Sequence, residues 1–198
     1  MLKNQKDIGF GCPNYQLAVY IANKPAMTEY QQLNKIHALS TGEIAIINQA
    51  CGNGWRKIFN VFAKVLFALD KELFDYQKQA NSWQKYRDQV LLQQGSRTAL
   101  LFTPPQRNTI TNTITNTITN TNEISNTTIH IITGRGYAKE LITTKKINTS
   151  LTWLDHEFAI DISSKVIVCP YFDYRQLSNI KIIRLAELIK QLKNSSLN

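Results

Sequence analysis

The stretch Thr128–Leu141 (TIHIITGRGYAKEL) indicates the fold more directly than any other part of the chain. Its first six residues are largely β-branched and apolar, which is typical of a buried strand. Gly134-Arg135-Gly136 then forms a turn that leads into a short helix over Tyr137–Leu141. A strand, a glycine turn and a helix in succession are typical of a parallel sheet covered by helices. The stretch therefore predicts an α/β fold.

Similar short apolar runs recur along the chain. We predict buried strands over Glu43–Asn48 (EIAIIN), Thr98–Thr103 (TALLFT) and Lys165–Cys169 (KVIVC), and a further strand over Tyr15–Ala22. Helical spacing of apolar residues predicts helices over Thr28–Leu39 (which Gly42 would end), Trp55–Gln79, Ser82–Gln94 and Asn179–Leu192, with a short helical or irregular piece at Trp153–Phe158. This alternation predicts a three-layer α/β sandwich with a mainly parallel, about four-stranded sheet.

Length and composition fit one globular domain over residues 1–198. The chain has 23 Lys and Arg against 14 Asp and Glu, a net charge of +9, and this charge is spread along the sequence. A diffuse basic excess attracts nucleic acid only weakly, and a soluble basic surface is the alternative. No apolar stretch reaches the ~18–20 residues of a membrane helix. We therefore expect a cytoplasmic protein with no membrane partner.

The three cysteines are too few and too widely spaced to form a disulfide framework or a zinc site. His, Cys, Asp and Glu do not recur at ligand spacing, so we predict no metal, and no cofactor motif is complete. Residues 108–122 read NTITNTITNTITNTN, and we predict a low-complexity surface loop over 106–127 inserted within the domain. A Thr-lined β-ribbon is the alternative.

In parallel sheets, ligands bind outside the carboxyl ends of the strands. That rule selects four segments: Gln49–Arg56, Thr103–Arg107, Thr133–Tyr137 and Cys169–Ser178. The third segment contains Arg135 between two glycines, but position 139 is Lys where a dinucleotide fingerprint has its third Gly. Arg135 is therefore a candidate for binding an anion, without evidence for nicotinamide.

The first segment carries Cys51, Asn53, Trp55 and Arg56 before a long helix, and Trp55 and Arg56 are candidate binding residues. Backbone amides at a helix start bind anions, and Arg56 would add a bidentate contact with a phosphate or carboxylate. Cys51 at such a position is a candidate nucleophile, and Asn53 a candidate for positioning water. The alternative is a tight turn that uses glycine only for its dihedral angles.

The last segment reads CPYFDYRQLS and places three aromatic residues, an acid and a base in one loop. Tyr171, Phe172 and Tyr174 are candidates for stacking on a base, and Arg175 for contacting phosphate. Asp173 is either a general base or the partner of Arg175. The aromatic residues could equally pack onto the core, with Ser178 or Asn179 capping the last helix.

The order of these elements resembles the uracil-DNA glycosylase superfamily over roughly residues 43–192. Gln49–Trp55 stands where that family has its water-activating motif, Pro104-Pro105 where its second core strand ends, and Thr133–Leu141 resembles its strand–Gly–helix entry. Cys169–Asn179 stands where the family carries a His-Pro-Ser loop that reaches the DNA minor groove. The resemblance implies a glycosylase-like sheet and DNA as a partner.

The family's standard catalytic residues are absent, because no His flanks Pro170 and the first turn lacks the acidic or Asn-Pro-Tyr signature. The three cysteines cannot hold an iron–sulfur cluster. The stretches Gly54–Lys57 (GWRK) and Cys169–Ser178 are also similar to those of an uncharacterised bacterial protein family, which implies no function.

Three hypotheses remain, and they leave open whether the chain is an enzyme. The first is a domain that recognises nucleic acid or a nucleotide on a glycosylase-like fold. The second is a scaffold protein that binds partners through the aromatic loop at 171–174. The third is a small-molecule α/β enzyme that uses Cys51 or Asp173.

Overall fold

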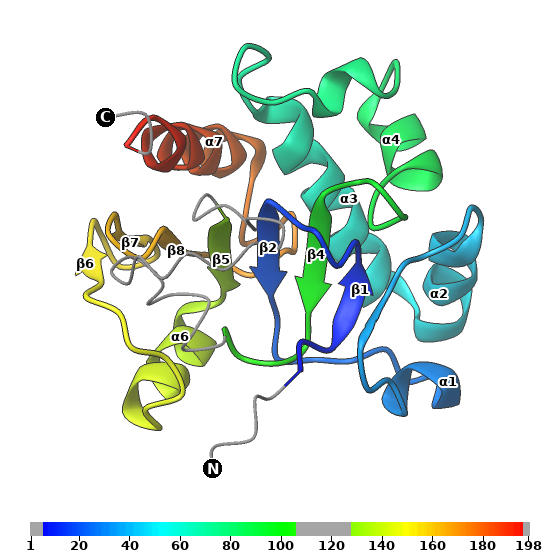
Figure 1. The fold of residues 1–198 in the computed structure, drawn as a ribbon, viewed down its shortest axis with the longest axis horizontal. Helices are drawn as coiled ribbons and strands as arrows, with labels where there is room; N and C mark the ends of the chain where they lie inside the picture. Colours follow the sequence, from blue (N-terminus) through cyan, green and yellow to red (C-terminus); the bar gives the residue numbers. More distant parts are fainter. Residues whose placement is uncertain (1–5, 106–127, 196–198) are drawn as a thin grey trace, which may run out of the picture.

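A computed structural model describes residues 6–105 and 128–195 of the chain. An eight-stranded sheet runs through it, with helices packed on both faces (Figure 1). The predicted α/β class is confirmed. The predicted 106–127 loop lies outside the described residues, and so does the Asn-Thr-Ile repeat within it. None of the described helices is long and apolar enough to cross a membrane.

Four parallel strands form the centre of the sheet, in the spatial order β4 (Thr98–Leu101), β2 (Leu17–Tyr20), β5 (Ile129–Thr133) and β8 (Val166–Cys169). All of their residues are buried. Near-continuous apolar sequence suits strands that are covered on both faces. All four lie within or overlap the predicted strands, so the sequence pattern located them correctly.

Short strands extend both edges of this centre and make the sheet mixed. β1 (Gly9–Gly11) pairs antiparallel with β4 and parallel with β3 (Ile36–His37). On the other side, β7 (Ala159–Asp161) and β6 (Thr152–Trp153) add two antiparallel strands beyond β8. The prediction of an about four-stranded, mainly parallel sheet is therefore wrong for the sheet as a whole. Of the piece predicted as helical or irregular at Trp153–Phe158, Trp153 belongs to β6 and residues 154–158 form the irregular turn of the β6–β7 hairpin.

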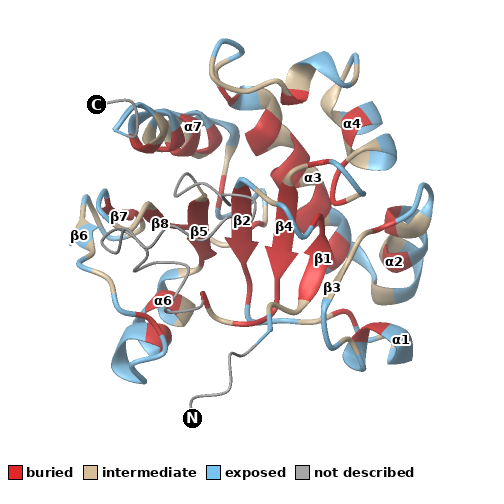
Figure 2. Cartoon of the chain, viewed as in Figure 1, coloured by how far each residue is buried: buried red, intermediate tan, exposed pale blue. Residues whose placement is uncertain are grey.

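Two hydrophobic cores lie on the two faces of the sheet (Figure 2). The larger core lies under α3 (Asn53–Ala68), α4 (Trp83–Gln89) and α7 (Asn179–Asn194). The smaller core lies under α6 (Arg135–Thr143). Because side chains alternate along a strand, Leu17 and Val19 of β2 belong to the first core and Ala18 and Tyr20 to the second.

The segment Glu43–Asn48, predicted as a strand, is the first part of helix α2 (Glu43–Cys51). Ile44 and Ile47 are buried, whereas Ile46 is 56% exposed, so the continuous apolar run hides a helical spacing. The Glu43 side chain accepts a hydrogen bond from the backbone N–H of Ser40 at 2.8 Å. Gly42, with a φ of 89°, is the N-cap of α2, so it precedes a helix instead of ending one.

Three predicted helices are shorter than expected, and the one predicted over Ser82–Gln94 covers only Trp83–Gln89 (α4). Helix α1 covers only Thr28–Gln31, and residues 36–37 form β3. α3 ends at Ala68 because Leu69 is extended, and Gln77 donates hydrogen bonds to the carbonyl oxygens of Phe67 and Leu69 at 2.6 and 2.9 Å. The chain then turns into the short 3-10 helix η1 (Tyr76–Lys78).

Candidate functional site

The four central strands end at the same edge of the sheet, and the chain order there creates a switch point. After β2 the chain passes to β4 on one side, and it later returns to β5 on the other side of β2. Ligands of open α/β sheets bind in the crevice outside the strand ends at such a point. Here Tyr171, which follows β8, lies close to the segments that follow β2 and β5. Its hydroxyl accepts a hydrogen bond from Asn23 at 3.4 Å, and a side chain at Gly134 would meet its ring at 4.0 Å.

The loop after Tyr171 extends this edge toward the start of α3. Lys57 Nζ lies 2.8 Å from Asp173 Oδ2 and 5.1 Å from the centroid of the Tyr174 ring. The Arg175 guanidinium lies 6.0 Å from the same ring. Tyr174 is 57% exposed. An exposed aromatic ring between two cations is thus held at the edge by an ion pair to α3. We refer to Lys57, Asp173, Tyr174 and Arg175 as the rim cluster.

Both carboxylate oxygens of Asp173 accept hydrogen bonds. Desolvation would raise its pKa, but hydrogen bonds from Lys57 and from the backbone N–H of Arg175 outweigh that effect and lower the pKa below its ordinary value. A carboxylate with a lowered pKa is a weak general base at neutral pH. Arg175 is a partner of Asp173 through its backbone N–H, whereas the ion pair of Asp173 is with Lys57.

Two predicted binding residues belong to the core. Phe172 is fully buried and packs edge-on against Phe62 of α3, with ring centroids 5.8 Å apart. Trp55 is 7% exposed and packs against Phe102 and Phe10. Neither ring can stack on a ligand without leaving the core, so both are wrong as binding residues. Within the aromatic loop, only Tyr174 and the half-buried Tyr171 can face a ligand.

Helix α6 begins at this edge directly after β5. Gly134 has a φ of 92°, and no side chain caps the backbone amides that follow. The first turn carries no acidic residue, and open space surrounds the position of a side chain at Gly136. Arg135 is exposed and lies 5.2 Å over the Trp153 ring. A helix start without acid or cap leaves backbone donors available to an anion.

The segment Gln49–Arg56 follows no strand; it is the junction of α2 and α3. Cys51 is the last residue of α2 and is partly buried, so it is not at a helix start as predicted. Asn53 and Arg56 are exposed, and Arg56 makes no ion pair with any described residue. Within the described part, no hydrogen bond links Cys51 to a histidine.

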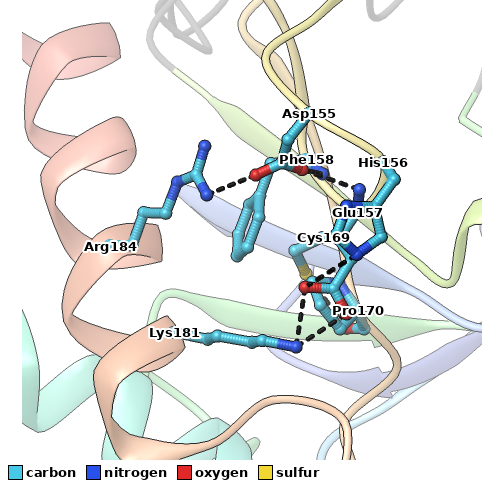
Figure 3. A network of polar contacts seen from close by, with 8 residues as sticks. All are labelled: Asp155, His156, Glu157, Phe158, Cys169, Pro170, Lys181 and Arg184. Carbon is cyan, nitrogen blue, oxygen red and sulfur yellow. Dashed lines mark hydrogen bonds and ion pairs between the residues drawn. The ribbon is translucent and has the colours of Figure 1, made fainter.

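The hairpin loop between β6 and β7 also lies at this edge, since Ala159 pairs with Val168 near the end of β8. Figure 3 shows two side chains of α7 that reach it: Arg184 pairs with Asp155, and Lys181 Nζ lies 2.6 Å from the Glu157 carboxylate. Burial would raise the pKa of Asp155, but two backbone N–H donors and Arg184 lower it to about 2. These pairs fasten the hairpin to α7.

The sequence analysis missed Lys57 and Asn23. Lys57 is adjacent to Arg56, which was selected, but one residue turns a helical side chain by about 100°. Which of the two side chains reaches Asp173, 116 residues away, depends on how α3 is rotated and packed against the loop. The polar Asn23-Lys24 pair directly after β2 was the one available signal for Asn23, because it follows a central strand.

Comparison with known proteins places the chain in one family. A family model described as a family of unknown function (DUF6942) matches residues 8–190, and the chain belongs to that family. No curated protein and no solved structure matches the chain. The similarity to an uncharacterised family agrees with this result. The resemblance to the uracil-DNA glycosylase superfamily has no support from these comparisons and stays a prediction.

Proposed function

We propose that this member of a family of unknown function is a binding domain for single-stranded nucleic acid, and that the strand lies along the carboxyl edge of its sheet. The observation that carries the proposal is the exposed Tyr174 ring between Lys57 and Arg175. Stacking on an exposed aromatic ring binds bases of any sequence, and flanking cations contact the phosphates on either side.

The neighbouring features support the same ligand. The open start of α6 offers backbone N–H groups to a phosphate, and Arg135 adds a cation there. Tyr171 lies close to that helix start and precedes the rim-cluster residues in the same loop, so it offers a second aromatic ring beside the phosphate contacts. A strand needs such a succession of contacts, whereas a mononucleotide would use only one of them.

Binding is favoured over chemistry by the state of the candidate catalytic groups. Asp173 is engaged with Lys57, Cys51 lies at a helix C-terminus, and Cys169 is buried. His130 is also buried and bonded to Tyr20. These positions leave recognition as the role that the described residues of the edge fit best.

Fluorescence anisotropy with labelled oligothymidylate tests the proposal at about 50 and 200 mM NaCl. Tyr174→Ala should weaken binding about tenfold, since stacking on one aromatic ring contributes ~1–3 kcal/mol. Tyr174→Phe should bind like the unaltered protein. Arg175→Gln should reduce the slope of log K against log salt by about 0.7, the value for one phosphate contact on a single strand.

Lys78→Gln is the matched control, because it removes the same charge from η1, beside Gln16 and Arg97 at the opposite edge of the sheet. If Arg175→Gln and Lys78→Gln have equal effects, binding depends only on the net charge of the protein, and the assignment to this edge is overturned. Absence of binding at the lower salt concentration would overturn the function itself. Tighter binding of duplex than of single strands would contradict the stacking role of Tyr174.

A further inference from the structure

A second surface lies on the helical layer and does not include the rim cluster. α3, α7 and the first residue of α4 enclose an open groove of about 360 Å³. Its walls are mostly apolar and include Phe67 of α3, Trp83 of α4, and Ile182 and Ile183 of α7, with Lys64 at its border. We call it the α3–α7 groove.

Exposed aliphatic side chains continue the groove along α7. Ile183 is 58% exposed, and Ile180, three positions earlier on the same helix face, is 81% exposed. Single exposed apolar residues are ordinary on protein surfaces, but here two of them adjoin a half-buried Trp and an apolar groove. Trp at the centre of a concave apolar surface is typical of a binding hot spot.

One cation at the border of the groove has no carboxylate partner. Helices α3, α4 and α7 carry nine Lys and Arg residues and two acidic residues, Asp88 and Glu187. Five of the nine cations pair with carboxylates of the chain: Lys57, Arg87, Lys181, Arg184 and Lys190. Lys64 makes no ion pair with any carboxylate in the described part of the chain, and its Nζ lies 5.1 Å from the centroid of the Trp83 ring. This cation beside an apolar groove favours an acidic occupant.

The shape of the surface distinguishes between acidic occupants. An anionic membrane takes up protruding apolar side chains, whereas Trp83 and Phe67 line a shallow groove between helices. Nucleic acid would gain little from the exposed Ile180 and Ile183. An amphipathic helix inserts apolar side chains spaced at i, i+3, i+4 and i+7 into such a groove and keeps its carboxylates at the border.

The geometry points to the α3–α7 groove as a docking site for an acidic amphipathic helix of a partner protein. Apolar residues of that helix would pack on Trp83 and Ile183, and its Asp or Glu side chains would pair with Lys64. The site is independent of the nucleic-acid edge, and its test uses variants that leave the rim cluster intact.

The test measures binding of a labelled, roughly 20-residue peptide of Glu, Ala and Leu with Leu at i, i+3, i+4 and i+7, long enough to form a helix. A scrambled peptide of the same composition is the peptide control. The full chain should bind the amphipathic peptide in the micromolar range, and the scrambled peptide at least about tenfold more weakly. Equal binding of both peptides, or no saturable binding of either, would overturn the proposal.

Variants locate the contact on the protein. Ile183→Ser and Lys64→Glu should each weaken peptide binding about tenfold, the scale of one hot-spot contact. Ile46→Ser, 56% exposed on α2, and Lys139→Glu on α6 are the matched controls and should change it less than twofold. Thermal melts verify that each variant is folded.

Two further probes separate the other occupants. Phosphatidylserine vesicles should bind without responding to Ile183→Ser, and oligothymidylate should not compete with the peptide. Vesicle binding that Ile183→Ser abolishes would show a membrane surface instead. Competition by oligothymidylate would place both ligands on one surface and overturn the separate site, while leaving the nucleic-acid function in place.

Discussion

The sheet face under α3, α4 and α7 differs from the face under α6 in the size and polarity of the side chains that fill it. The first is packed with aromatic residues. Phe10, for example, packs against Tyr30, Trp55 and Phe102, with ring centroids 4.9 to 6.4 Å apart. The second has alanine at four positions and contains a buried polar pair, Tyr20 and His130, joined by a 2.8 Å hydrogen bond. The first face depends on apolar burial, and the second also depends on one hydrogen bond and on the protonation state of a histidine.

The largest expected effect tests the apolar face. Phe62 is fully buried and contacts Phe172, so Phe62→Ala should lower the free energy of unfolding by about 4 kcal/mol. Leu141→Ala, on the α6 face, should cost about 2–3 kcal/mol because a smaller side chain leaves a smaller cavity. Denaturant unfolding measures both. Ile46→Ala on the surface is the control and should stay within about 0.5 kcal/mol. A larger loss from Leu141→Ala than from Phe62→Ala would reverse the comparison.

The next effect concerns pH and belongs to the α6 face. Burial, with a smaller contribution from Lys165, lowers the pKa of His130 from 6.5 to about 4. Below pH 6.5 the unfolded chain binds a proton at this residue that the folded chain does not bind. The free energy of unfolding should therefore fall as pH drops from about 6.5 to about 4, by about 3 kcal/mol in total.

Denaturant unfolding at several pH values measures this dependence, and His130→Gln should flatten it. The carboxylates Asp155 and Asp161, whose pKa values lie at about 2, also stabilise the fold less as the pH falls. Their contribution is lost only below about pH 4, so it does not overlap with that of His130. An identical pH dependence of the two proteins between about pH 6.5 and 4 would show that His130 is not the responsible group.

The sequence predicted the four central strands and the helix Tyr137–Leu141, which lies within α6, but it did not predict the strands at the edges of the sheet. β4, β5, β8 and α7 were recognisable because their apolar runs are bounded by turn residues and follow one period. The two- and three-residue strands β1, β3, β6 and β7 are too short to carry a period, and they exist only through pairing with distant partners. Glu43–Asn48 failed because a continuous apolar run fits a strand and a helix equally.

The location of the candidate site was predictable from the sequence, but the side chains that form it were not. The rule for strand ends located the loop after β8, which contains Tyr174 and Arg175. It could not tell that Phe172 is buried and Tyr174 exposed, because an irregular loop has no period that assigns side chains to a face. Nor could it find the Lys57–Asp173 pair, which is formed by packing between segments that are far apart in the chain.

A smaller effect is expected from the polar pair itself. Tyr20→Phe removes the hydroxyl partner of His130 and keeps the ring, so it leaves a buried nitrogen without its hydrogen bond. The loss should be about 1–2 kcal/mol in denaturant unfolding. Tyr171→Phe is the matched control at the half-exposed edge, where water can replace the bond to Asn23. An effect of Tyr20→Phe no larger than that of Tyr171→Phe would show that the pair on the α6 face contributes nothing specific.

The smallest effect is expected from deleting Asn108–Asn122. This segment connects Pro105, which follows β4, to Thr128, which precedes β5. It contains no aromatic and no charged residue, and its three Ile residues are four positions apart, so it has little apolar area to bury. Shortening a loop by this length changes the closure entropy by about 1 kcal/mol or less. Thermal melts of the full-length and shortened proteins should therefore differ by only a few degrees, and oligothymidylate binding should be unchanged.

A drop in Tm of more than about 8 °C exceeds what ~1 kcal/mol causes in a domain of this size. Such a drop would mean that the repeat stabilises the fold, and the comparison of the two faces would then have to include it.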